Sequence, residues 1–169
     1  SQTESWRDLI TGVGNYGGSN ATQEVFGVTS HSVTDEFTQN WCIFLLFDTS
    51  AIGTGQEVGF ATLTMKYDRS SDSDMDISSN IYSSNPASNT NIVAADYMLL
   101  GSTPFSTARD LYAETDGSTE VVRTLNSDGR SAVSVTGITK LGLGLVQAHE
   151  AGGGTPTWAY PASSRLMVR

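Results

Sequence analysis

Short segments with a period of two, each bounded by turn-forming residues, constrain the fold of this chain most strongly. The longest uninterrupted apolar stretch runs only from Trp41 to Phe47. With Asp48 it predicts one central β-strand, because it is too short for a buried helix. Beyond a glycine-rich turn, residues from Val58 to Tyr67 alternate between two faces, which predicts a second long strand with one face in the core.

Further segments of this kind bring the total to about eight strands. They are Trp6 to Val13, Glu24 to Thr29, Met75 to Ser84, Glu120 to Leu125, Lys140 to Ala148 and Ser163 to Val168. Helical patterns are confined to two short connectors, Ile92 to Leu100 and a helix over Gly129 to Val135 that Asn126 caps. The pattern predicts an all-β fold, an antiparallel two-sheet sandwich in which residues 1–169 form a single domain.

Composition narrows the choice of partners. The 169 residues carry 9 Lys and Arg against 18 Asp and Glu, for a net charge of −9, and the basic residues do not cluster. This argues against a nucleic-acid partner, because phosphate binding depends on clustered Lys and Arg. No apolar stretch approaches the roughly 20 residues of a bilayer helix, so no membrane insertion is expected. The single Cys42 cannot form an internal disulfide.

Catalytic motifs are absent or out of context. Residues Gly12 to Gly17 match GxGxxG, but no convincing helix follows, so a glycine-rich loop is favoured over dinucleotide binding. GxSxG is missing, and neither His31 nor His149 has the neighbours of a zinc site. Cys42 lies in the apolar run and is interpreted as a core residue. A glycosidase needs only two carboxylates, and no pair stands out among the eighteen. We therefore predict no enzyme, no catalytic residues and no cofactor.

A cluster of aspartates is the one candidate metal site. Asp72, Asp74 and Asp76 alternate along an extended segment, which would direct their carboxylates to one side as oxygen ligands for calcium. The EF-hand pattern is not met, because Ile77 stands at the position of the loop glycine. The alternative is a solvated acidic edge that discourages aggregation between sheets.

Trp158 and Tyr160 are the candidate ligand-binding residues. They lie in a Gly- and Pro-rich segment, Gly152 to Pro161, which should form a surface loop. Exposed aromatic rings there could stack on the sugar rings of a glycan. The alternative is that both aromatics fold back to cover one end of a sheet.

Several segments together resemble a known module family. Phe44 to Ile52 followed by Val58 to Met65 resembles the paired signature of the jelly-roll modules called DNRLRE or disaggregatase-related domains. Further similarity is spread over nearly the whole chain, at Ser83 to Thr90, Ala95 to Tyr97, Leu125 to Asn126, Gly129, Gly137 to Leu143 and Arg165 to Val168. These are folding signatures, and the string Asp-Asn-Arg-Leu-Arg-Glu itself is absent. The resemblance implies a non-enzymatic jelly-roll β-sandwich displayed outside a cell or on a virion.

Two functions follow as expectations. The first is a structural or decoration protein of a virion, such as a phage capsid or fibre, or of another extracellular assembly, whose partners are copies of itself or a capsid or surface-layer protein. The second is a carbohydrate-binding or adhesive surface module at Trp158 and Tyr160, with calcium as a supporting ion. Both place the protein on a virion surface or outside a cell.

Overall fold

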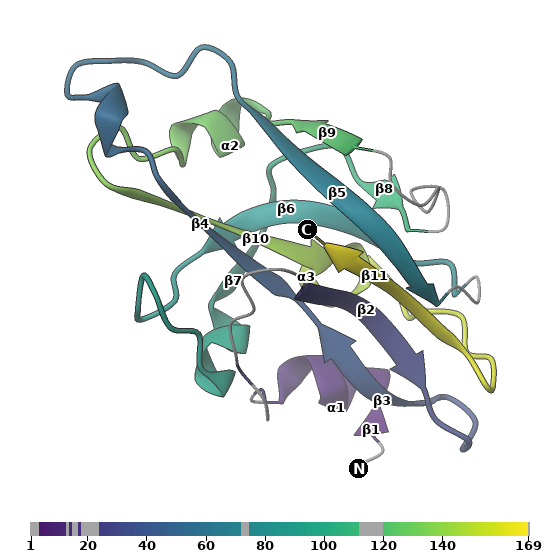
Figure 1. The fold of residues 1–169 in the computed structure, drawn as a ribbon. Helices are drawn as coiled ribbons and strands as arrows, with labels where there is room; N and C mark the ends of the chain where they lie inside the picture. Colours follow the sequence, from purple (N-terminus) through teal and green to yellow (C-terminus); the bar gives the residue numbers. More distant parts are fainter. Residues whose placement is uncertain are drawn as a thin grey trace.

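The computed structural model describes residues 4–12, 14, 17, 24–71, 75–111 and 120–168, and the description below is confined to them. These residues form two antiparallel sheets around a shared apolar core (Figure 1). The prediction of an all-β antiparallel fold is therefore confirmed.

The first sheet has the strand order β1-β3-β2-β11-β5-β9. Its strands are β1 (Glu4–Ser5), β2 (Glu24–Ser30), β3 (Glu36–Trp41), β5 (Thr62–Ser71), β9 (Glu120–Thr124) and β11 (Ser163–Val168). The second sheet has the order β4-β10-β6-β7, with β8 also pairing with β6. Its strands are β4 (Ile43–Asp48), β6 (Ser78–Ser84), β7 (Leu100–Pro104), β8 (Arg109–Asp110) and β10 (Ile138–Leu145). From β3 onward the chain changes sheet at every connection except those joining β6, β7 and β8.

Short helices connect the strands. They are α1 (Trp6–Thr11), α2 (Ser127–Ser131), α3 (Val146–His149) and the 3-10 helices η1 (Ser50–Ile52) and η2 (Ala94–Leu99). The predicted cap of α2 is confirmed, because the Asn126 side chain accepts a hydrogen bond from the Gly129 N–H at 2.9 Å. In the described part of the chain no helix is long and apolar enough to cross a bilayer.

Alternation along the strands builds the core. Leu63, Met65 and Tyr67 of β5 are buried, as the period-two pattern predicts. Leu141, Leu143 and Leu145 of β10 are buried in the same cluster from the other sheet. Each sheet thus contributes every second side chain to one interior.

Some strand predictions are wrong. Lys140 to Ala148 was expected as one strand, but β10 ends at Leu145 and Val146–His149 is helical. Trp6 to Val13 was expected as a strand, but Trp6–Thr11 is helical, because Ser5 caps the segment by accepting a hydrogen bond from the Asp8 N–H. The run from Trp41 to Asp48 is not one central strand. It divides at Cys42 into the end of β3 and the whole of β4, and β4 lies at the edge of its sheet.

Candidate functional site

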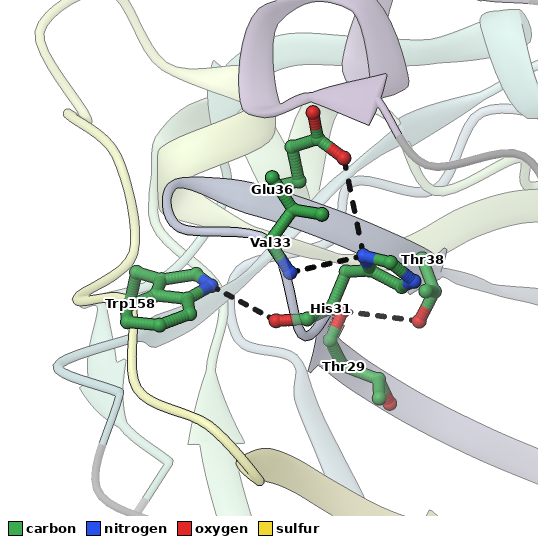
Figure 2. A network of polar contacts seen from close by, with 6 residues as sticks. All are labelled: Thr29, His31, Val33, Glu36, Thr38 and Trp158. Atoms are coloured by element: carbon green, nitrogen blue, oxygen red, sulfur yellow. Dashed lines mark hydrogen bonds and ion pairs between the residues drawn. The ribbon is translucent and has the colours of Figure 1, made fainter.

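The predicted ligand-binding aromatics lie in the loop between α3 and β11. Trp158 is half-buried and packs against the core, and its indole N–H donates to the carbonyl of His31 at 3.2 Å (Figure 2). Tyr160 is exposed, with 58% of its surface accessible. For Trp158 this is the alternative in which the ring covers a sheet end, whereas Tyr160 presents its ring to solvent.

The turn between β2 and β3 supplies polar atoms beside Trp158 (Figure 2). The Val33 N–H donates to His31 Nδ1 at 3.1 Å, which places the acceptor lone pair of the neutral imidazole at that nitrogen. Glu36 Oε2 lies 3.9 Å from the same nitrogen. This carboxylate oxygen is buried and has no hydrogen-bond partner among the described residues.

The predicted calcium ligands are only partly described. Asp72 and Asp74 lie outside the described residues, and Asp76 is exposed with a positive φ of 52° just before β6. The described residues contain no group of three or more His, Cys, Asp or Glu side chains arranged to hold a metal ion. Calcium binding at Asp72, Asp74 and Asp76 stays a prediction.

The titratable groups inside the molecule take part in packing and hydrogen bonding. Burial raises the pKa of Cys42 to about 12, so its thiol is protonated at neutral pH, whereas a nucleophilic cysteine needs a thiolate. The phenol of buried Tyr82 donates to Glu150 Oε1 at 2.9 Å, and Asn80 Nδ2 donates to the same oxygen at 3.2 Å. Burial lowers the pKa of His149, which packs on the Tyr82 ring, to about 4. These contacts fasten α3 and Glu150 to β6.

Three large apolar side chains, together named the apolar end, are exposed between the end of β4 and the start of β5, a stretch that Figure 1 places at the other end of the sheets from the loop between α3 and β11. Phe47 is 38% exposed, Ile52 of η1 is 40% exposed and Phe60 is 71% exposed. Sequence reasoning assigned Phe60 to a strand, but β5 starts at Thr62 and Phe60 precedes it in an extended connection. In the alternating pattern Phe60 shares the side of the exposed Thr62 and Thr64, opposite to the buried residues of β5.

Hydrogen bonds hold this apolar end in one conformation. Thr49 Oγ1 donates to the Ser134 carbonyl at 2.6 Å, and the Gly53 N–H donates to the Val135 carbonyl at 2.8 Å. Asp48 accepts from both the hydroxyl and the N–H of Ser50, and these two bonds lower the pKa of its carboxyl group. The turn that carries Ile52 is therefore fixed before any partner arrives.

Comparisons of the chain with protein-family models, with curated proteins and with solved structures found no match.

Proposed function

We propose that this chain is a non-enzymatic structural protein of a virion or another extracellular assembly, acting through contacts with copies of itself or a shell protein. The observation that carries the proposal is the exposed apolar end formed by Phe47, Ile52 and Phe60. Contiguous water-exposed apolar side chains are typical of protein–protein contacts, and these three come from the end of β4 and the connection to β5. Because the turn of η1 is already fixed, docking would cost little conformational entropy there.

The jelly-roll topology belongs to the same proposal. The strand orders β2-β11-β5-β9 and β4-β10-β6-β7 support it, because they pair the first long strand with the last and alternate the chain between two four-stranded sheets. Two Greek keys folded in this way form a jelly roll, a fold that is common in viral capsid proteins. In this interpretation β1, β3 and β8 are additions to the eight strands.

Light scattering and negative-stain imaging of the purified chain test the proposal. We expect defined oligomers or particles, and Phe60→Ser should reduce their amount while the far-UV circular dichroism stays the same. Tyr160→Ser is the matched control, since it removes an equally prominent aromatic side chain at the opposite end. Equal assembly of wild type and both variants would refute a role for the apolar end.

Glycan binding is the second candidate, favoured by the exposed ring of Tyr160. A glycan panel run with and without calcium would show retention that Tyr160→Ala abolishes and Phe60→Ser leaves unchanged. No retention of any glycan by the wild type in either condition would reject this candidate.

A further inference from the structure

The outer edge of β4 presents backbone hydrogen-bonding groups that no strand in the described part of the chain pairs. β4 ends its sheet, and within the described ranges no strand pairs with its outer side. The Thr49 N–H donates to the Gly137 carbonyl, so in the alternating antiparallel ladder Thr49 and every second residue before it face β10. The backbone N–H and C=O groups of Phe44, Leu46 and Asp48 therefore point away from the sheet.

This edge lacks the features that normally prevent pairing. Natural sheet edges carry a Lys, a Pro or a bulge. β4 has the sequence Ile-Phe-Leu-Leu-Phe-Asp, its ladder with β10 shows no register shift, and its one charge is at the last position. At the edge of the other sheet, by contrast, Arg109 Nη1 donates to the outward-facing Val122 carbonyl of β9 at 3.4 Å.

We infer that β4 pairs antiparallel with β4 of a second copy of this chain and joins two five-stranded sheets across a two-fold axis. The inference rests on the proposed function and names its partner and contact. With the axis at Leu46, Leu46 of each copy faces Leu46 of the other, and Phe44 faces Asp48. This register is the one that uses all three outward-facing positions of both strands. Such an isologous contact closes as a dimer.

Charge favours the antiparallel arrangement. In this register the two Asp48 side chains lie four residues apart along the strand direction, or about 13 Å. That exceeds the Debye length of about 8 Å at physiological ionic strength. Parallel pairing would place the carboxylates side by side. Because each chain carries a net charge of −9, the copies also repel at long range, and added salt should strengthen the dimer.

Proline substitution tests the edge without breaking the existing ladder. The N–H of Leu46 points outward, so Leu46→Pro removes a donor that the ladder with β10 does not use and that a second copy would use. Val122→Pro is the matched control on β9. The Leu125 N–H donates to the Ala61 carbonyl, so Leu125 and every second residue before it face β5. Val122 lies between two of these residues, and its N–H therefore points outward. Sedimentation velocity over a concentration series should show self-association at least tenfold weaker for Leu46→Pro and unchanged for Val122→Pro.

A cysteine variant tests the register independently and does not depend on the tolerance of β4 for proline. Directly opposite residues of a hydrogen-bonded antiparallel pair have Cα atoms about 5.5 Å apart. That spacing suits a disulfide. Leu46→Cys should therefore form a covalent dimer on mild oxidation, and Val122→Cys should not. Cys42 is present in both variants and serves as an internal control.

The outcomes separate this inference from the proposed function. If the wild type assembles and the Leu46 variants behave like the Val122 variants, β4 pairing is wrong and assembly through another surface stands. If the wild type is a monomer at every concentration and salt condition, the inference is wrong, as is the part of the proposed function that relies on contacts between copies, and contact with a shell protein is the part that stands. Loss of association and cross-linking confined to the Leu46 variants would establish the contact.

Discussion

Substitution of Gly144 in β10 by alanine tests how closely His149 of α3 packs against the second sheet. A Cβ at Gly144 would lie 2.5 Å from His149 Cδ2 and 2.8 Å from His149 Nε2, well inside normal contact distance. The imidazole cannot turn aside freely, because it packs on the Tyr82 ring with centroids 5.1 Å apart. Gly144→Ala therefore forces α3 away from the strand or the His149 ring out of its place.

The expected change in the free energy of unfolding is the difference between two opposing effects. Overpacking a well-filled site costs about 1–3 kcal/mol. Replacing glycine by alanine restricts the unfolded chain and returns about 0.4–1 kcal/mol. The net loss in free energy of unfolding should be about 1–2 kcal/mol for Gly144→Ala. At Gly142 the added Cβ meets only the branched end of Leu100, at 2.9–3.1 Å, so a smaller loss is expected there.

Urea denaturation followed by far-UV circular dichroism measures these differences. Gly59→Ala is the control, since nothing lies within 4 Å of the added Cβ and the backbone there is not in the left-handed region. It should leave the midpoint unchanged or raise it slightly. A Gly144→Ala protein as stable as Gly59→Ala would refute the close approach of His149 to β10.

Three further predictions concern stability. Burial lowers the pKa of His149 to about 4 in the folded protein. Below about pH 6.5 His149 is therefore protonated in the unfolded chain and stays neutral in the folded protein. The free energy of unfolding consequently falls as the pH drops from 6.5 toward 4. Between pH 7 and pH 5 the loss should reach up to about 2 kcal/mol, and His149→Phe should reduce it in urea titrations at both pH values. Trp158→Phe removes the indole bond to the His31 carbonyl and should cost about 1 kcal/mol by the same assay, with Tyr160→Phe unchanged. Asn126→Ala removes the cap of α2 and should lower the thermal midpoint by the equivalent of about 1–2 kcal/mol, whereas Ser127→Ala should not.

Much of the fold could be predicted from local pattern. The alternation of Leu63, Met65 and Tyr67 gave β5 its buried face, and the Asn126 side chain marked the start of α2. β7 was missed, because its sequence Leu-Gly-Ser-Thr-Pro resembles a turn and its strand geometry comes from pairing with β6. Tertiary pairing of this kind leaves no local signal.

The candidate site was predictable only in part. Trp158 and Tyr160 do lie in a loop, as the Gly- and Pro-rich composition indicated. Their different exposure depends on one acceptor, the carbonyl of His31, which is distant in sequence. This carbonyl accepts the indole N–H and holds Trp158 against the sheet end. No pattern within residues 152–161 specifies that contact.

The incorrect placement of β4 has a physical explanation that bears on its proposed partner. A six-residue strand with five apolar side chains normally lies between two other strands, where both backbone edges are paired and both faces are covered. β4 has β10 on one side only, and Phe47 at its end remains 38% exposed. Sequence reasoning tends to fail at functional positions, where a residue choice serves something other than the isolated fold. If a second copy supplies the missing neighbour, β4 becomes interior in the assembled protein, and its composition and its position agree.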